Sequence, residues 1–151
     1  MSVEIQYRNL PMLLLQTREQ IISHFRPILN HHGITEQQWR IMRALHEKQS
    51  MEPRELCSFC QILSPSLTGI LKRMEEMSLV EKKGIPGDKR RLKISLTAQG
   101  ERLIEKISPL ISEQYNYLEE AYGPQVFDQL QKMLELFTEN DQVTVNQVDL
   151  I

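Results

Sequence analysis

Two short segments in the middle of the chain carry side chains suited to binding phosphates and base edges. The first lies within residues 64–73 and combines hydroxyls, a proline, a glycine and two cations: Ser64, Pro65, Ser66, Thr68, Gly69, Lys72 and Arg73. The second is an acid followed by three cations: Asp88, Lys89, Arg90 and Arg91. Hydroxyl and cationic side chains meet phosphates and base edges in a major groove, and an Arg at a hairpin tip can enter a narrow minor groove. The two segments therefore predict contacts to duplex DNA.

The first segment is expected on a helix. Ser64 is a preferred N-cap and Pro65 suits the first helical position, where no N–H is needed. The apolar residues that follow fall on one face at helical spacing: Leu67, Ile70, Leu71, Met74 and Met77. Because Gly69 has no side chain, it would let the opposite face approach a ligand closely.

The second segment is expected at the tip of a β-hairpin. Residues 79–83 can form a short strand, and Leu92, Ile94 and Leu96 alternate with polar residues as in a half-buried strand. The turn between them, Gly84–Arg91, carries the cations, and we expect Asp88 to orient Arg90 by a charged hydrogen bond. A helix followed by such a basic hairpin is the order of elements in a winged helix-turn-helix.

The distribution of charge supports this interpretation. Residues 64–93 contain eight Lys or Arg against four acids, a net charge of +4, whereas the whole chain has a net charge of −2. Residues 113–151 contain eight acids and one Lys. A basic segment within an acidic chain is the electrostatic pattern expected of a DNA-binding protein.

The run Asp88–Thr97 resembles the wing signature of the MarR family: Asp, one residue, Arg, then a strand ending in Leu-Thr. Residues 35–40 and 65–71 resemble the branch of that family that controls operons for the degradation of aromatic acids, as do residues 14–19 and 25–28. The resemblance implies a homodimeric transcriptional regulator, expected to be a repressor, that binds a palindromic operator in double-stranded DNA and is released by a small aromatic acid.

The resemblance also implies where the effector binds. An Arg/His pair six residues apart on the first helix is similar to the pattern Arg18/His24 here, and Trp39, Arg40 and Arg43 follow on the second helix. An Arg offers a bidentate fork to a carboxylate, and an aromatic wall holds a ring. The alternative is that Arg18 and Arg43 pair with acids such as Glu19 or Glu47.

The fold predicted from these patterns is mainly α-helical with a small antiparallel β-wing, in a single domain, residues 1–151. Its winged helix-turn-helix core spans about residues 34–97, and the helices of residues 1–33 and 98–151 form a dimerisation region. We expect one helix over about residues 10–30 bent by Pro27, and a capping box at Thr35–Gln38 opening a helix that buries Trp39. A short helix near Pro53, a long one from Thr97 interrupted or kinked at Pro109, and a last one after Gly123-Pro124 complete the expected elements.

The outer helices carry more apolar surface than one small winged domain can cover. Burial against a second copy would give a two-fold dimer, whose symmetry matches a palindromic operator.

Two alternatives to an effector-released DNA-binding protein remain open. Cys57 and Cys60 have C-x-x-C spacing, so a thiol-based redox regulator is one alternative; on the inward face of a helix both would instead behave as small apolar groups. A winged module that binds protein rather than DNA is the other alternative, against which the basic wing argues.

Several classes of protein are not indicated. A zinc site would need two further ligands, and His31-His32 does not have a metal-ligand spacing, so neither metal nor cofactor is expected. No Ser lies on a strand-to-helix elbow, so an enzyme is not predicted. No apolar run approaches the ~20 residues of a membrane span, and no signal peptide is recognised, so a cytoplasmic location is expected.

Overall fold

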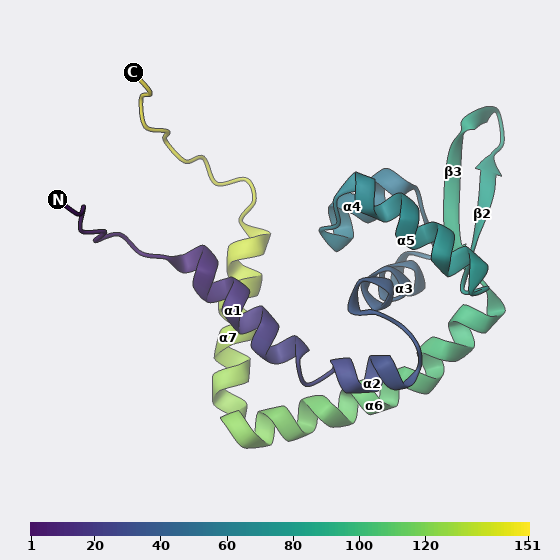
Figure 1. The fold of residues 1–151 in the computed structure, drawn as a ribbon, viewed down its shortest axis with the longest axis horizontal. Helices are drawn as coiled ribbons and strands as arrows, with labels where there is room; N and C mark the ends of the chain where they lie inside the picture. The colour runs from purple at the N-terminus through teal and green to yellow at the C-terminus, as the bar shows by residue number, and fades with distance from the viewer. The chain divides into compact units, whose positions relative to one another are not determined.

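The computed structural model describes residues 1–151. Its elements follow in the order α1 (Leu10–Ile22), α2 (Arg26–His31), α3 (Glu36–Lys48), β1 (Ser50–Met51), α4 (Pro53–Cys60), α5 (Ser64–Glu76), β2 (Val80–Ile85), β3 (Asp88–Leu96), α6 (Ala98–Tyr122) and α7 (Pro124–Glu139). The predicted class is confirmed: the chain is mainly helical with one small antiparallel sheet, and the hairpin β2–β3 projects beside α5 (Figure 1).

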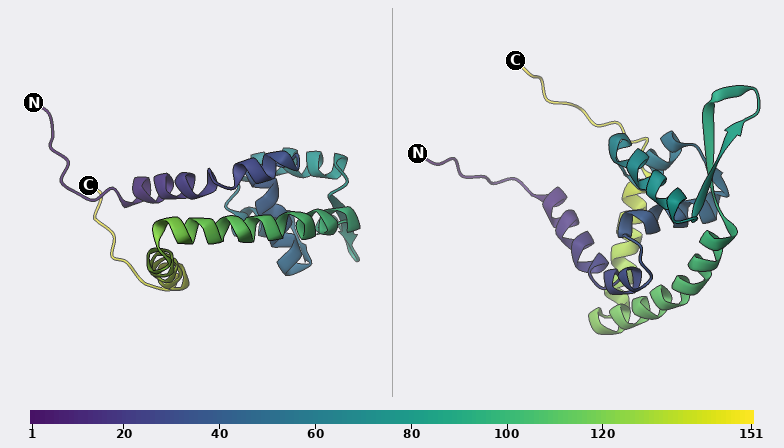
Figure 2. Two further views of the ribbon diagram at one scale, coloured as in Figure 1. Left: turned by 90° about the horizontal axis from the view of Figure 1, so that it is seen from below. Right: turned by 45° about the vertical axis from the view of Figure 1, so that its right-hand side comes forward.

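The chain forms two units, Met1–Ser112 and Glu113–Ile151, which are described separately. The first unit contains the winged helix-turn-helix. Its core is built from the inward faces of α3, α4, α5 and β3, where side chains such as Ile41, Leu56, Met74 and Ile94 are fully buried. In the view at the right of Figure 2, the hairpin extends beyond α3, α4 and α5. The second unit consists of the end of α6, then α7 and the C-terminal segment.

The sheet has a third strand that the sequence pattern did not predict. β1 has two residues and pairs antiparallel with β3, Ser50 opposite Ser95 and Met51 opposite Ile94, so the order is β1-β3-β2. A strand this short has no alternating pattern to detect. It closes one side of the wing and buries Met51.

The expected single helix over residues 10–30 is wrong. Residues 23–25 form a turn that separates α1 from α2, and Pro27 lies in the first turn of α2 rather than in the interior of a longer helix. Proline lacks an N–H, so the start of a helix is where it costs least. Gly33, after α2, has a φ of +72°, the left-handed conformation that glycine tolerates best.

Helix starts were predicted with mixed success. At α3, Thr35 and Gln38 form the expected reciprocal capping box. At α5 the N-cap is Leu63, not Ser64, and no side chain caps the helix. Ser64 is already helical, so its hydroxyl does not have the position from which an N-cap side chain accepts a backbone hydrogen bond.

Three further expectations are wrong. Trp39 and Cys57 are only half-buried, whereas both were expected to face inward. Leu92 is 39% exposed because it lies on the part of the hairpin that extends beyond the core. Of the expected interruption or kink at Pro109, the interruption is wrong, because α6 continues through this residue to Tyr122.

Candidate nucleic-acid interface and effector site

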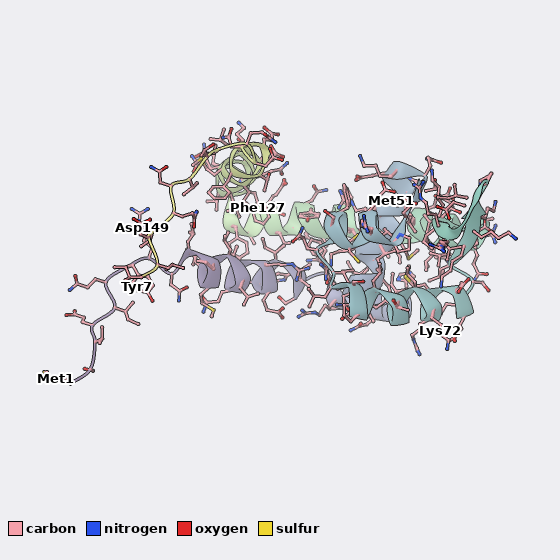
Figure 3. The ribbon with its side chains drawn as sticks, turned by 90° about the horizontal axis from the view of Figure 1, so that it is seen from above. Met1, Tyr7, Met51, Lys72, Phe127 and Asp149 are labelled. Atoms are coloured by element: carbon pink, nitrogen blue, oxygen red, sulfur yellow. The ribbon has the colours of Figure 1, made fainter.

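α5 separates its side chains into two faces as predicted. Leu67, Leu71 and Met74 are buried, whereas Ile70 and Met77, which were expected on the same face, are half-buried. The predicted DNA-binding residues of this helix are all exposed: Ser64, Pro65, Ser66, Thr68, Gly69, Lys72 and Arg73. A Cβ built on Gly69 would meet nothing within 4 Å, so this position lies against open space. Figure 3 shows Lys72 projecting from α5 on the side away from Met51 of β1.

The wing turn is tighter than predicted. β2 runs to Ile85 and β3 begins at Asp88, so Pro86 and Gly87 alone form the loop, and Gly87 has a φ of +89°. The three cations Lys89, Arg90 and Arg91 therefore lie on β3, not in a flexible loop. A strand fixes the direction of successive side chains to alternate faces, which holds Arg90 and Arg91 on opposite sides.

The expected hydrogen bond between the Arg90 guanidinium and Asp88 does not form. The Asp88 Oδ1 atom accepts from the backbone N–H of Arg90 at 2.9 Å. An Asp side chain commonly closes a turn on the backbone two residues ahead. Asp88 thus fixes the backbone of the hairpin end and leaves the Arg90 guanidinium free.

Ion pairing divides the cations of this region into two sets. Lys82, Lys83 and Arg91 each have a carboxylate partner, respectively Glu75, Glu81 and Glu52. By contrast, no carboxylate lies within 4 Å of the cationic atoms of the other five cations, all of which are exposed: Lys72, Arg73, Lys89, Arg90 and Lys93. These five unpaired cations, two on α5 and three on β3, form a part of the surface that lacks an internal counter-charge.

Arg91 was predicted with the DNA-binding residues, but it is held by the first helix of the helix-turn-helix. Its Nε lies 2.6 Å from the Oε1 of Glu52, the N-cap of α4. The hydrogen bond from Arg91 is the main cause that lowers the pKa of Glu52 from its ordinary value. This pair fixes the wing to α4. Sequence patterns did not identify Glu52, because the two residues are 39 positions apart.

The structure brings together two of the five predicted effector residues. Arg18 of α1 and Arg40 of α3 share one carboxylate, that of Glu36: the Arg18 Nη2 atom lies 2.6 Å and the Arg40 Nε atom 2.9 Å from its Oε1. Arg40 also donates from Nη1 to the carbonyl of Cys60 at 2.6 Å. Glu36 was not predicted as part of this cluster, although its spacing of four from Arg40 is a recognisable ion-pair signal.

The other three predicted effector residues are not linked to this cluster. Arg43 lies 3.8 Å from Glu47, as the alternative interpretation held. His24 is exposed in the turn after α1, and Trp39 is half-buried on α3. Arg18 does not pair with Glu19, which is paired with Arg26 instead.

Two hollows lie elsewhere on the first unit. One, of about 670 Å³, lies between the end of α3, β1 and α4 and is lined by Lys48, Ser50, Met51, Arg54, Glu55, Ser58 and Phe59. The other, of about 370 Å³, lies on the sheet and is lined by Ser50, Lys83, Gly84, Ile85, Pro86, Lys93 and Ser95. Neither includes a predicted effector residue.

Both cysteines are free thiols. Cys60 is buried and its Sγ contacts the carbonyl of Arg40 at 3.6 Å; burial raises the pKa of this thiol. A raised pKa lowers the population of thiolate, the reactive form.

No group of three or more His, Cys, Asp or Glu side chains is arranged to hold a metal ion. None of the helices combines the length and apolar composition needed to cross a bilayer.

The sequence pattern of the MarR family matches residues 34–92, from the start of α3 to the middle of β3. The homoprotocatechuate degradative operon repressor of Escherichia coli is 44% identical over 129 residues, which cover 85% of this chain and 87% of that protein. The chain belongs to the MarR family. The transcriptional regulator FarR of Neisseria gonorrhoeae is 41% identical over 123 residues, 82% of this chain and 84% of that protein. The relatives are transcriptional regulators, and this MarR-family chain is not an enzyme.

Solved structures show the same fold. The transcriptional regulator PA4135 has a TM-score of 0.83 at 37% identity, covering 92% of this chain and 100% of that one. NadR in complex with 4-hydroxyphenylacetate has a TM-score of 0.76 at 39% identity, covering 91% and 97%. A mutant MarR of E. coli bound to operator DNA has a TM-score of 0.76 at 21% identity, a likeness of fold alone.

Proposed function

We propose that this MarR-family regulator is a cytoplasmic homodimeric repressor that binds a palindromic operator and is released by a small aromatic acid. The observation that carries the DNA-binding part is the set of five exposed cations without internal partners: Lys72 and Arg73 on α5, and Lys89, Arg90 and Lys93 on β3. DNA phosphates would supply the missing counter-charge, and α5 would present its hydroxyls and Gly69 to base edges in the major groove.

Dimerisation is supported by apolar side chains that each unit leaves exposed. α1 has no buried residue and exposes Leu10, Met12, Leu13, Leu14 and Leu15. α7 likewise has no buried residue and exposes Val126, Met133, Leu134, Leu136 and Phe137. Contiguous apolar surface of this kind marks an interface, and a second copy is the economical partner because a dimer matches two operator half-sites.

The aromatic-acid response is supported by the relatives and by the charge cluster on α1 and α3. One relative is named for homoprotocatechuate degradation and one structural neighbour contains 4-hydroxyphenylacetate, both of which are small aromatic acids. In this chain Arg18 and Arg40 already hold a carboxylate, that of Glu36, with Trp39 on the same helix as Arg40. An effector carboxylate would compete with Glu36 for these guanidinium groups, with His24 and Arg43 as further contacts.

Competition at this cluster would reach the DNA-binding helices through Arg40. Its Nη1 donates to the carbonyl of Cys60, the last residue of α4, so a change in the Glu36 pairing changes a contact to the turn before α5. A ligand shifts an equilibrium only by its differential affinity for the two states, and the Arg40 contact is the one that we propose differs between them.

Two variants test DNA binding and effector binding separately. Lys72→Ala should lower the slope of log affinity against log salt by about 1 for each phosphate that the variant no longer neutralises. Lys132→Ala, on α7 and paired with Asp128, is the matched control and should leave the slope unchanged. An unchanged slope in Lys72→Ala would contradict the proposed docking of α5.

The second variant, Arg18→Ala, tests the effector site. It should abolish the heat of binding of 4-hydroxyphenylacetate in calorimetry while operator binding remains, because Arg18 lies outside α5 and the wing and Arg40 keeps both Glu36 and the carbonyl of Cys60 as partners. Binding at full strength by this variant would remove Arg18 from the site.

A further inference from the structure

The turn after α5 contains a non-glycine residue in a left-handed conformation. After the C-cap Met77, Ser78 adopts a φ of +60°, a left-handed conformation that residues other than glycine rarely take. The N–H of Leu79 donates to the carbonyl of Met74 at 3.0 Å, and that of Ser78 to the carbonyl of Glu75 at 2.9 Å. This pattern is a Schellman motif with serine at the position that glycine usually fills.

Thr97, the residue before α6, donates two hydrogen bonds to the turn that follows α5. The Thr97 hydroxyl donates to the carbonyl of Ser78 at 2.6 Å, and the Thr97 N–H donates to the carbonyl of Leu79 at 3.0 Å. The same hydroxyl accepts from the N–H of Gly100 at 3.0 Å and so caps α6. One side chain therefore caps the start of α6 and binds the turn that follows α5.

Gly100 makes this approach possible. A Cβ built on it would lie 2.3 Å from the carbonyl oxygen of Leu79 and 3.1 Å from Cδ2 of Leu96. The first of these neighbours is backbone, so it cannot be moved by a change of rotamer. Position 100 must be glycine for the two segments to keep this distance.

α3 also contacts the start of α6 and the turn after α5. His46, near the end of α3, lies 2.8 Å from Glu101 of α6 through Nδ1 and Oε2. Gln38, buried in the first turn of α3, places its amide nitrogen 3.8 Å from the sulfur of Met77. The turn Met77–Leu79, the start of α6 and both ends of α3 thus form one connected joint within the first unit.

We propose that Thr97 and Gly100 are positioning residues that set the orientation of α5 on DNA and transmit displacements of α6 to α5. Packed joints with several hydrogen bonds move as one body rather than deforming continuously. This inference rests on the proposed function, since it specifies how a change in the dimerisation region would reach the DNA-binding helix.

The test compares variants of Thr97. Thr97→Ser keeps the hydroxyl, and Thr97→Val keeps the shape but loses both of its hydrogen bonds. In Thr97→Val we expect operator affinity to fall about fivefold or more, and the ratio of affinities without and with 4-hydroxyphenylacetate to fall toward one. Thr97→Ser should restore both values. Thr138→Val is the control, because the Thr138 hydroxyl bonds only to carbonyls of its own helix, α7.

A readout that needs no DNA separates this inference from the proposed function. Backbone hydrogen exchange of residues 76–79 should rise about tenfold in Thr97→Val, with exchange in α3 and α4 unchanged, and should be normal in Thr97→Ser. Gly100→Ala should show the same local increase if it folds. Unchanged exchange in Thr97→Val, or unchanged affinity and response in a folded dimeric Thr97→Val, would overturn the inference. Failure of the wild-type protein to bind an operator would instead overturn the proposed function.

Discussion

Adjacent residues on the wing have different electrostatic environments. Arg91 is paired with Glu52 at 2.6 Å, whereas no carboxylate lies within 4 Å of the Arg90 guanidinium. The backbone of Arg90 is fixed by Asp88, so its exposed side chain starts from a defined point on β3. A free Arg on a rigid strand is suited to enter a minor groove, where negative potential is concentrated.

We predict that Arg90 and Arg91 contribute differently to operator affinity. Arg90→Ala should weaken operator binding by about 1–3 kcal/mol, and Arg91→Ala should weaken it less, because Arg91 is already neutralised within the protein. Fluorescence anisotropy on one duplex measures both. A larger loss in Arg91→Ala than in Arg90→Ala would reverse the assigned roles.

The two cysteines should also differ in reactivity. Burial raises the pKa of Cys60, while Cys57 is only half-buried, so alkylation at neutral pH should modify Cys57 first. Peptide mass spectrometry after a short treatment with iodoacetamide distinguishes them. If Cys60 reacted first, and mild peroxide also weakened DNA binding, the thiol-sensing alternative would be favoured.

At the scale of elements, the ion pair that joins the wing to α4 should weaken on acidification. The hydrogen bond from Arg91 lowers the pKa of Glu52, so the folded form binds this proton less readily than the unfolded form. The stabilisation by the pair is therefore fully present above the ordinary pKa of a glutamate and is lost as the pH falls through the lowered value.

This prediction can be measured on the carboxyl group itself. A carbon NMR titration of Glu52 should give a midpoint below that of an ordinary glutamate, and Arg91→Gln should move it upward. An equal midpoint in the two proteins would show that the pair does not form in solution.

The elements illustrate which features a sequence can predict. Apolar spacing located α5, α6 and α7, and the capping chemistry of Thr35–Gln38 was found because it depends on residues close in sequence. The helix break at residues 23–25 was missed, because the apolar pattern continues through it to Phe25 and Leu29, which are buried in the same core. β1 depends on pairing with β3, a contact between residues more than forty positions apart, as in Ser50 with Ser95.

In the candidate site, too, the sequence predicts features that depend on neighbouring residues and not those that depend on distant ones. The exposed cations of α5 and β3 could be identified from local patterns alone. The sequence could not predict which cations remain unpaired, because Glu52 pairs with Arg91 and Glu36 pairs with Arg18 across the fold. The hydrogen bond from Thr97 to the turn after α5 could not be predicted either, since it depends on the placement of two backbone segments.

For the whole molecule, the exposed apolar face of α1 predicts the assembly state. Leu14→Glu should convert a dimer into a monomer in sedimentation velocity, since it places a charge within a surface that a second copy would bury. Gln16→Glu, at an exposed polar position of the same helix, is the matched control. A wild-type protein that sediments as a monomer at micromolar concentration would contradict the proposed dimer.

The central claim is that one dimer couples an aromatic acid to DNA release. The most direct measurement selects duplexes from a randomised pool with the wild-type protein and titrates the enriched duplex with and without 4-hydroxyphenylacetate. We expect the enriched sequences to be inverted repeats, and the ligand to weaken binding by about fivefold to a hundredfold. Enrichment of no sequence, or an affinity that saturating ligand leaves unchanged, would contradict the account.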